Sequence, residues 1–340
     1  FDQQVRRGQF QYTRQPRYFE EAMKFVGVIE HPDNIDDILH EAFRQAFTGK
    51  PGPVYIEYPQ DFSAATHTFG PLKQSAEYRL LQQSADSSSL ERAVTLLENA
   101  QQPVLLVGYG VFVSRAQEAV NRLASALRCP VITTPGAQSR LLDVLDASAP
   151  YATPAANEAI AQADVVLAVG TEIGEPLHYG TGRHWLEGRK DRQWIYVERD
   201  GTAVGVNRPI DVPLVGDLRD VVPQLQALVD DRQFTARFPE RFSGLQEQAQ
   251  TELAAALNAA PAGPSIHPAH MAHEVAAAMP ENPVIIRDGG AVSLWGMAFG
   301  GIDSSDIHWS QNFGHLGTGI PHAIGAQLAV GDSRRVVLVS

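Results

Sequence analysis

The sequence is poor in the residues and motifs that mark several large protein classes. Its one cysteine in 340 residues, Cys129, excludes an internal disulfide and a cysteine-based zinc site. No stretch approaches the roughly 18 consecutive apolar residues of a membrane span. The 27 basic residues are outnumbered by 39 acidic ones, and the net charge of −12 disfavours a nucleic-acid backbone as partner. We therefore expect a cytoplasmic protein with neither membrane nor nucleic-acid partners.

Motifs of common catalytic sites are also missing. There is no Gly-x-Ser-x-Gly elbow, no Walker A sequence and no His-Glu-x-x-His pair. His267, His270 and His273 have helical spacing, but His267 precedes Pro268, so we interpret them as the solvated start of a helix. No metal ligand is therefore predicted within this chain.

The sequence does contain short apolar strands that alternate with amphipathic helices, a pattern typical of parallel sheets covered by helices. Apolar residues make up 44%, enough for sizeable cores, and 340 residues are long for one domain. We predict an α/β fold of three consecutive domains, the first and third of them incomplete. Their bounds are 1–68, 89–230 and 266–340, with linkers at 69–88 and 231–265.

Apolar periodicity and capping residues predict the elements of each domain. Asp33 is expected to cap a helix that ends at Gly49, Thr153 to cap another, and Ser114 with Gln117 to form a capping box. Strands are expected at 54–57, 104–107, 131–133, 165–169, 194–197, 212–215, 284–287 and 335–340. Helices are expected at 33–49, 90–100, 115–127, 154–163, 218–229 and 268–279.

Two glycine-rich turns follow strands of the middle domain. Gly108-Tyr109-Gly110 lacks the third glycine of the dinucleotide fingerprint, because Val113 stands there, and no acidic residue ends the next strand. A tight turn is the better interpretation of it. The turn from Gly170 to Gly174 fits either a cofactor crevice or an ordinary change of chain direction.

Two further glycine-rich loops belong to the third domain. Asp288-Gly289-Gly290-Ala291 follows a strand, and Gly314, Gly317 and Gly319 precede a helix of small residues. Glycines allow backbone N–H groups to approach an anionic ligand closely. Since both loops lie at carboxyl ends of strands in one domain, they predict a ligand crevice. His315 lies between the glycines, either lining that crevice or exposed in the loop.

Three motifs in order resemble thiamine diphosphate-dependent enzymes. Residues 52–61 (GPVYIEYPQD) resemble the GPVxxxxPxD signature that closes the pyrimidine-binding domain of that superfamily. Residues 103–110, 155–160 and 164–170 look like its central domain. Residues 314–326 (GHLGTGIPHAIGA) are similar to the GxxGxGxPxAIGA segment of its diphosphate-binding domain. The chain looks most like the acetolactate synthase group, whose FQ…K pattern matches Phe10, Gln11 and Lys24.

The resemblance implies roles for individual residues. Gly290, Ala291 and Val292 match the positions whose backbone binds the cofactor diphosphate, and Gly289 is placed with them. Leu316 matches the bulky residue that props thiamine diphosphate in its bent shape. The loop around the aminopyrimidine is matched by Gly314 and Gly317, with His315 near the reacting carbon. In the acetolactate synthase group, the residues matching Gln11 and Lys24 lie near the active-site entrance.

The activity implied is that of a lyase or carboligase. A pyruvate-type 2-keto acid loses CO2 on the cofactor, and the acyl carbanion equivalent passes to a second carbonyl compound or a proton. A homodimer or homotetramer is implied, with active sites between subunits. The activating glutamate is expected upstream of Phe1, and the GDG…N motif for Mg2+ beyond Ser340. The flavin-contacting segments are altered at 151–154 and 172–177, which disfavours FAD.

Several other functions are compatible with these motifs. A benzoylformate-type decarboxylase and a 2-hydroxyacyl-CoA lyase are the nearest ones. Basic residues contacting CoA phosphates would favour the lyase, and Arg183, Arg189, Lys190 and Arg192 cluster in sequence, although a solvated loop is the better interpretation of them. A non-catalytic relative could keep the fold as a binding or regulatory subunit. An NAD-binding protein is disfavoured by Val113 and by the Thr133-Thr134 strand ending.

Overall fold

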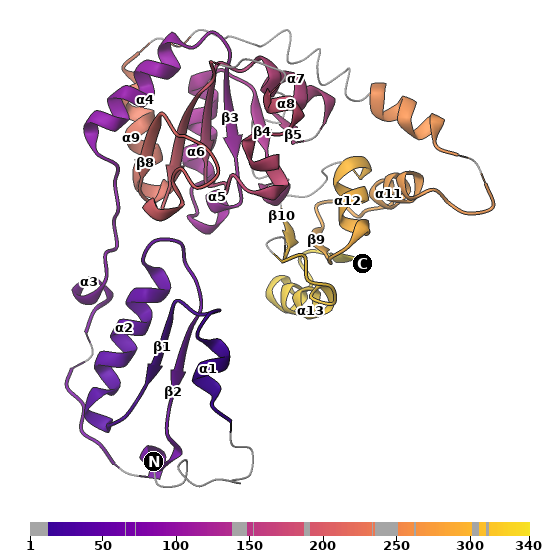
Figure 1. The fold of residues 1–340 in the computed structure, drawn as a ribbon. Coiled ribbons are helices and arrows are strands. Elements are labelled where there is room, and N and C mark those ends of the chain that lie inside the picture. Colours follow the sequence, from indigo (N-terminus) through magenta and orange to yellow (C-terminus); the bar gives the residue numbers. More distant parts are fainter. Residues whose placement is uncertain are drawn as a thin grey trace. The chain divides into compact units, whose positions relative to one another are not determined.

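The computed structural model describes residues 13–64, 66–71, 73–137, 148–151, 153–186, 191–232, 234, 251–261, 263–300, 306–310 and 313–340 (Figure 1). They form a two-stranded, a six-stranded and a three-stranded sheet, each entirely parallel, so the α/β class is confirmed. Each sheet falls in one of the three predicted domains. Residue contacts divide the chain into two units, Phe1–Gln83 with Arg199–Gly201, and all the rest. The three domain bounds stay a prediction.

The first unit contains the two-stranded sheet. Strand β1 (Phe25–Val28) pairs with β2 (Val54–Glu57), and α2 (Ile35–Phe47) connects them as a crossover helix. The shorter elements of this unit are α1 (Gln15–Phe19), η1 (Pro32–Asn34), η2 (Gln60–Ala64) and α3 (Ser75–Tyr78). Strand β1 was not predicted, because a four-residue run that contains a glycine carries little periodicity. The cap was wrong as well: His31 Nδ1 accepts the Asp33 N–H, and α2 begins only at Ile35.

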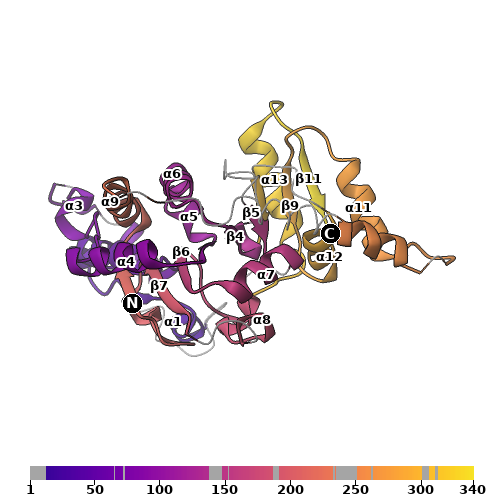
Figure 2. The same cartoon turned by 90° about the horizontal axis from the view of Figure 1, so that it is seen from above.

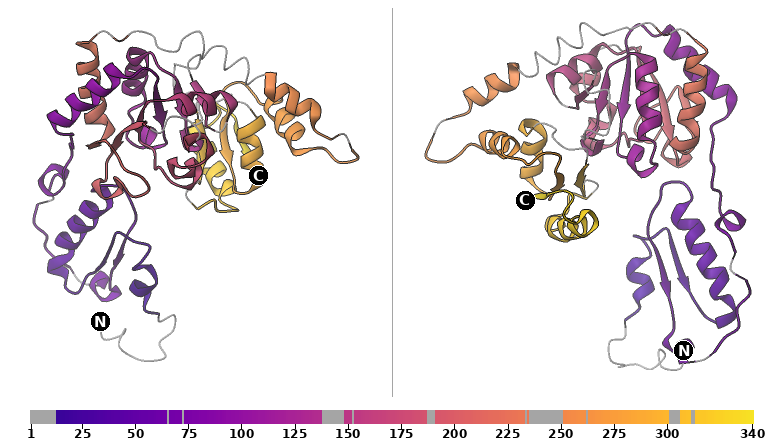
Figure 3. Two further views of the ribbon diagram at one scale, coloured as in Figure 1. Left: turned by 45° about the horizontal axis from the view of Figure 1, so that its top comes forward. Right: turned by 180° about the vertical axis from the view of Figure 1, so that it is seen from behind.

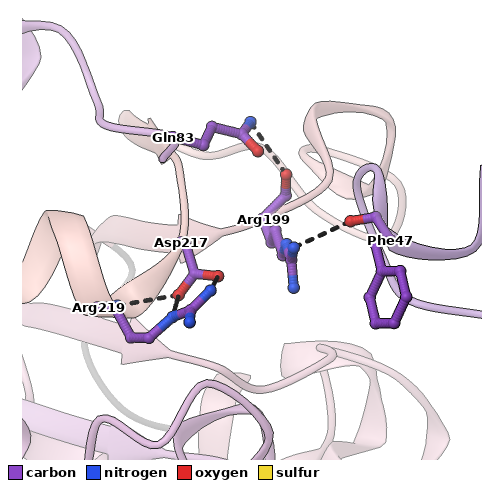
Figure 4. A network of polar contacts seen from close by, with 5 residues as sticks. All are labelled: Phe47, Gln83, Arg199, Asp217 and Arg219. Atoms are coloured by element: carbon purple, nitrogen blue, oxygen red, sulfur yellow. Dashed lines mark hydrogen bonds and ion pairs between the residues drawn. The ribbon is translucent and has the colours of Figure 1, made fainter. Parts of the chain in front are cut away.

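The turn Arg199–Gly201 belongs to this first unit although it follows a strand of the six-stranded sheet. Arg199 Nη2 donates to the carbonyl of Phe47 at 2.9 Å, and Gln83 Nε2 donates to the carbonyl of Arg199 at 3.3 Å (Figure 4). Gly49 has a φ of +61°, and a Cβ there would lie 3.3 Å from Asp200 Cγ. The Arg199 guanidinium thus satisfies a carbonyl at the end of α2, where no intrahelical donor is available.

The six-stranded sheet has the order β5-β4-β3-β6-β7-β8, the order of the doubly-wound α/β fold. Its strands are β3 (Pro103–Val107), β4 (Val131–Thr133), β5 (Ser148–Pro150), β6 (Val165–Val169), β7 (Gln193–Glu198) and β8 (Val212–Val215). Five of these were predicted. Strand β5 was not, because its three residues, Ser-Ala-Pro, include no β-branched or aromatic side chain.

Helices cover both faces of this sheet (Figure 3). One apolar core lies between the sheet and α4 (Ser87–Asn99), α6 (Gln117–Leu127) and α9 (Leu218–Asp230). The other lies toward α7 (Pro154–Gln162) and α8 (Arg183–Leu186). Leu105 and Val107 point into the first core and Val104 and Leu106 into the second. This alternation explains why the strands are apolar throughout.

The helices that cover this sheet show which of the predicted capping residues are correct. Thr153 Oγ1 accepts the Ala156 N–H at 3.3 Å, which confirms the predicted cap of α7. The predicted Ser114 capping box is wrong: Ser114 follows a separate short helix, α5 (Gly110–Val113), and Ala116 is the N-cap of α6. At α9, Asp217 accepts from the backbone and the guanidinium of Arg219 (Figure 4).

Arg192 is a buried structural residue, not part of a basic surface patch. Its guanidinium donates to the carbonyls of Ala163 at 3.0 Å, Trp185 at 2.8 Å and Ile160 at 2.6 Å. The carbonyls of Ile160 and Ala163 lie at the end of α7, where carbonyl groups have no intrahelical donor. Burial lowers the pKa of Arg192 to about 10, so the group stays charged at neutral pH.

Replacing Arg192 with methionine should lower the free energy of unfolding by about 3 kcal/mol, because several buried carbonyls lose their donor. Urea unfolding followed by tryptophan fluorescence would measure this, since Trp185 and Trp194 lie in the same core. Arg122→Ala is the matched control: its exposed pair with Glu118 should contribute only about 0.5 kcal/mol. Equal losses for the two variants would contradict the structural role of Arg192.

The three-stranded sheet has the order β10-β9-β11. Its strands are β9 (Val284–Arg287), β10 (Asp306–Trp309) and β11 (Val336–Val339). Helix α13 (Gly319–Val330) lies on one face, with α11 (Pro268–Ala277) and α12 (Ala291–Phe299) on the other (Figure 2). His267 caps α11, since its Nδ1 accepts the Ala269 N–H at 3.3 Å. Among the described residues, no helix has the length and apolar character needed to cross a membrane.

Candidate functional site

The two glycine-rich loops of the three-stranded sheet meet at Asp288, the residue directly after β9. Asp288 is 5% exposed. Its Oδ1 accepts the N–H of Gly289 at 2.7 Å and the N–H of Gly317 at 2.9 Å, and Oδ2 lies 3.2 Å from the same Gly317 nitrogen. Hydrogen bonds from Gly289, and further ones from Gly319, Gly317 and Thr318, hold the pKa of Asp288 below its usual value. The carboxylate is thus the common acceptor of both loops.

The backbone of Asp288 is fixed as firmly as its side chain. Its N–H donates to the carbonyl of Val339 at 2.9 Å, at the end of β11. Its carbonyl accepts a hydrogen bond from the hydroxyl of Ser293, which is fully buried in the first turn of α12. One residue therefore connects β9, β11, α12 and the loop that precedes α13.

The glycines allow the two loops to touch. A Cβ on Gly289 would lie 2.5 Å from the carbonyl oxygen of Gly314 and 2.7 Å from that of His315. A Cβ on Gly319 would lie 2.6 Å from Leu338 Cδ1 and 3.0 Å from Asp288 Cβ. Backbone atoms oppose a side chain at Gly289, so glycine is required there, while at Gly319 the end of the Leu338 side chain would have to move aside.

The diphosphate positions predicted for the first loop coincide with the start of α12. Gly290, with a φ of +94°, is its N-cap and offers no side chain to the first-turn N–H groups. Ala291 and Val292 are the first two helical residues, whose N–H groups have no intrahelical acceptor. A nine-residue helix that begins with uncapped N–H groups favours an anion at this end. These three residues therefore fit a diphosphate.

Leu316 lies next to this helix start. Its side chain is 75% exposed, and its Cδ2 lies 3.3 Å from where a Cβ on Gly290 would be. The structure thus brings the predicted prop and the predicted diphosphate loop together. His315 is exposed and stacks against Phe313, with ring centroids 5.0 Å apart and planes 11° from parallel. Gly314 and Gly317, with φ of +57° and +83°, give this loop its shape.

The other predicted site residues belong to the first unit. Gln11 and its neighbour Phe10 lie outside the described residues. The ammonium of Lys24 donates to the carbonyls of Thr48 and Lys50, where α2 ends. Its stem lies against Gly52, where a Cβ would be 2.9 Å from Lys24 Cδ. In this structure Lys24 therefore satisfies helix-end carbonyls, and its placement at an active-site entrance stays a prediction.

In the six-stranded sheet, a doubly-wound fold would bind a cofactor at the switch point between β3 and β6. The turns there pack directly on each other. Gly110 N–H donates to the Gly170 carbonyl at 2.8 Å, and a Cβ on Gly108 would lie 2.3 Å from that oxygen. Gly170 has a φ of +59°. These glycines serve backbone-to-backbone packing, which supports the tight-turn interpretation.

Tyr151, in the altered segment 151–154, belongs to a hydrogen-bonded aromatic cluster with Trp185 and with His178, which directly follows the altered segment 172–177. The Tyr151 hydroxyl lies 3.0 Å from His178 Nδ1 and accepts the Trp185 Nε1–H at 3.2 Å. His178 and Tyr179 both have positive φ, and Arg208 Nη1 bonds to the carbonyl of the next residue, Gly180, at 2.7 Å. These side chains bond to one another, and the absence of FAD stays a prediction.

No metal site emerges from the described part of the chain, where no three His, Cys, Asp or Glu side chains are placed to hold an ion. Asp288 is the main residue that sequence reasoning missed. The glycines that follow Asp288 were predicted to bind a ligand, but no role was predicted for the Asp288 carboxylate. The available signal was an acidic residue directly after a buried strand and before two glycines.

Comparison with known proteins identifies the six-stranded sheet. Residues 90–225 match the family model of the thiamine pyrophosphate enzyme central domain. This segment resembles a thiamine pyrophosphate enzyme central domain. The matched range extends from α4 to α9 and includes all six strands. The helices on both faces of the sheet are therefore part of the family's own architecture.

The relatives extend the similarity to nearly the whole chain. An acetolactate synthase of Arthrospira platensis is 26% identical over 324 residues, which are 90% of this chain and 54% of the relative. The acetolactate synthase large subunit of Parasynechococcus marenigrum is 28% identical over 334 residues, 94% of this chain and 51% of the relative. A 2-hydroxyacyl-CoA lyase of Arabidopsis thaliana is 28% identical over 237 residues, 68% of this chain and 40% of the relative.

These similarities confirm the predicted resemblance to thiamine diphosphate-dependent enzymes of acetolactate synthase type. The chain spans about half the length of the acetolactate synthases that it matches. The two glycine-rich loops at residues 288–290 and 314–319 follow the matched range in sequence, and their assignment to a diphosphate-binding domain stays a prediction.

Proposed function

We propose that this protein is a thiamine diphosphate-dependent lyase or carboligase that acts on a 2-keto acid, as acetolactate synthases do. The observation that carries the proposal is the pair of glycine-rich loops joined at Asp288, next to the uncapped start of α12. The match of residues 90–225 to the thiamine pyrophosphate enzyme central domain supports it. So does the similarity to acetolactate synthases over most of the chain.

In this proposal, each loop would hold a different part of the cofactor. Gly290, Ala291 and Val292 would hold the diphosphate through backbone N–H groups and the positive end of the α12 dipole, next to Gly289, whose own N–H is bonded to Asp288. Gly314, Leu316 and Gly317 would surround the aminopyrimidine side, with the exposed Leu316 side chain as an apolar support. When bound, thiamine diphosphate supplies the electron sink that allows a 2-keto acid to lose CO2.

The chain's own contribution to such a reaction is binding and orientation. Backbone N–H groups fixed by helix geometry need no rearrangement when the anion arrives. Leu316 and the Phe313–His315 stack present apolar surface beside the loops, and this surface would keep water from the reacting group once covered. Phe313 is 83% exposed, so it is available for contact with a substrate or a partner subunit.

Mg2+ and a homodimeric or homotetrameric assembly belong to the proposal as well. We place the complete active site between two subunits. Both are features implied by the resemblance to acetolactate synthases.

The activity is tested on the full-length protein with thiamine diphosphate, Mg2+ and pyruvate. The expected result is release of CO2 together with formation of acetolactate, both dependent on the cofactor. A protein that binds the cofactor and releases CO2 but forms only the aldehyde would be a decarboxylase of the benzoylformate type. A protein that neither binds the cofactor nor consumes any 2-keto acid would contradict the proposal and indicate a non-catalytic relative.

A 2-hydroxyacyl-CoA lyase activity is the second candidate, favoured by the similarity to the Arabidopsis enzyme over 68% of the chain. The structure weakens its predicted recognition element. Arg192 is buried and bonded to carbonyls, so it cannot contact a CoA phosphate. Arg189 and Lys190 lie outside the described residues. Cleavage of a 2-hydroxyacyl-CoA by the full-length protein, with no turnover of pyruvate, would establish this activity instead.

A further inference from the structure

The Asp288 side chain is shared by both glycine-rich loops. Its two carboxylate oxygens are directed to the N–H groups of Gly289 and Gly317, residues that are far apart in sequence. A carboxylate accepts hydrogen bonds only, and here it meets donors only. Bonds between an ionised carboxylate and backbone N–H groups are among the stronger ones in proteins.

The position of this carboxylate is determined from three sides. The Asp288 N–H is bonded to Val339, its carbonyl to the Ser293 hydroxyl, and its Cβ and Cγ lie against Gly319. At 5% exposure, water has little access to compete for the two N–H groups. The Asp288 carboxylate, which is fixed by these contacts, thereby holds the loop at 314–319 against the start of α12.

We infer that Asp288 is a positioning residue, which holds the two glycine-rich loops together as a single preformed cradle for thiamine diphosphate. The inference rests on the proposed function for the identity of the ligand. The carboxylate points into the loop that carries Gly317. Hydrogen bonds from backbone N–H groups therefore balance the negative charge of Asp288. The diphosphate and aminopyrimidine positions are then correctly spaced before any cofactor arrives, which lowers the cost of binding.

Asp288→Asn is the central variant, because it keeps the size of the side chain and replaces one acceptor oxygen by a donor nitrogen that faces N–H groups. In the full-length protein with Mg2+, the dissociation constant of thiamine diphosphate should rise at least tenfold. The KM for the 2-keto acid, measured at saturating cofactor, should change less than threefold. Without cofactor, the amide hydrogens of Gly289 and Gly317 should exchange at least tenfold faster.

Asp306→Asn is the matched control. Asp306 lies in β10 of the same sheet and pairs with Arg334, away from both loops. It should lower the stability of the sheet without changing cofactor affinity or the exchange of the two loop amides. If Asp288→Asn fails to fold, as judged by circular dichroism, Asp288→Glu provides the test, since it retains the charge but displaces the carboxylate.

Wild-type cofactor affinity and wild-type exchange of the Gly317 amide in a folded Asp288 variant would overturn the inference. An equal loss of cofactor affinity in Asp306→Asn would also overturn it, because general destabilisation of the sheet would then explain both losses. Failure of the proposed function is a separate outcome. If the wild-type protein binds no thiamine diphosphate, that function is wrong, while the exchange experiment still decides whether Asp288 holds the loops together.

Discussion

Replacing Gly289 with alanine should weaken thiamine diphosphate binding at least a hundredfold, about 3 kcal/mol. The added methyl group would lie 2.5 Å from the Gly314 carbonyl oxygen and 2.7 Å from that of His315. Both neighbours are backbone atoms, so one loop must move away from the other. The proposed diphosphate and aminopyrimidine positions would then no longer be correctly spaced. Titration calorimetry of the full-length protein with the cofactor and Mg2+ measures the loss.

Gly325→Ala is the matched control for this variant. Gly325 lies within α13, and no atom is within 4 Å of the position that its Cβ would take. Alanine should therefore be tolerated there and should stabilise the helix by about 1 kcal/mol, because glycine is a poor helix former. Cofactor binding by Gly289→Ala that is as tight as that of Gly325→Ala would show that the contact between the two loops is not needed.

The second large effect is expected at the switch point of the six-stranded sheet. Gly108→Ala should lower the free energy of unfolding by about 4 kcal/mol, near the upper end for single substitutions. Its methyl group would lie 2.3 Å from the Gly170 carbonyl oxygen and 2.4 Å from Thr171 Cβ, between β3 and β6. Relief requires the two central strands to separate, which disturbs both apolar cores. Urea unfolding followed by tryptophan fluorescence measures this change.

Gly174→Ala provides the comparison in the same turn after β6. Its nearest neighbours, Glu172 and Pro176 side-chain atoms, lie 3.9 Å from the Cβ position, and its φ is −107°. This substitution should change the free energy of unfolding by less than about 0.5 kcal/mol. If Gly108→Ala were equally harmless, the turns could not be in direct contact, and a cofactor crevice at this switch point would again be possible.

Sequence periodicity was sufficient for the regular parts of the fold. The continuously apolar runs at β3, β6 and β7 predicted buried parallel strands, because each strand supplies side chains to a core on both faces. The short elements escaped prediction. Strand β5 and helices α5 and α8 have three or four residues each, too few to show a period. Their structure is determined by neighbours in space.

The candidate site could be predicted only in part, for a similar reason. The glycines of the third sheet are visible in the sequence as ligand-binding signals. The contacts of these glycines depend on tertiary structure: Gly289 and Gly319 avoid clashes with residues 19 to 31 positions away. The role of Asp288 depends on N–H groups that reach it from a distant loop. Arg192 was misread for the same reason, since only folding brings three carbonyls around it.

The most direct test of the account is titration calorimetry of the full-length protein with thiamine diphosphate, with and without Mg2+. The account predicts saturable binding of one cofactor per chain that requires Mg2+ and is lost in Gly289→Ala but kept in Gly325→Ala. The absence of Mg2+-dependent binding by the folded wild-type protein would contradict the assignment of the two glycine-rich loops to this cofactor.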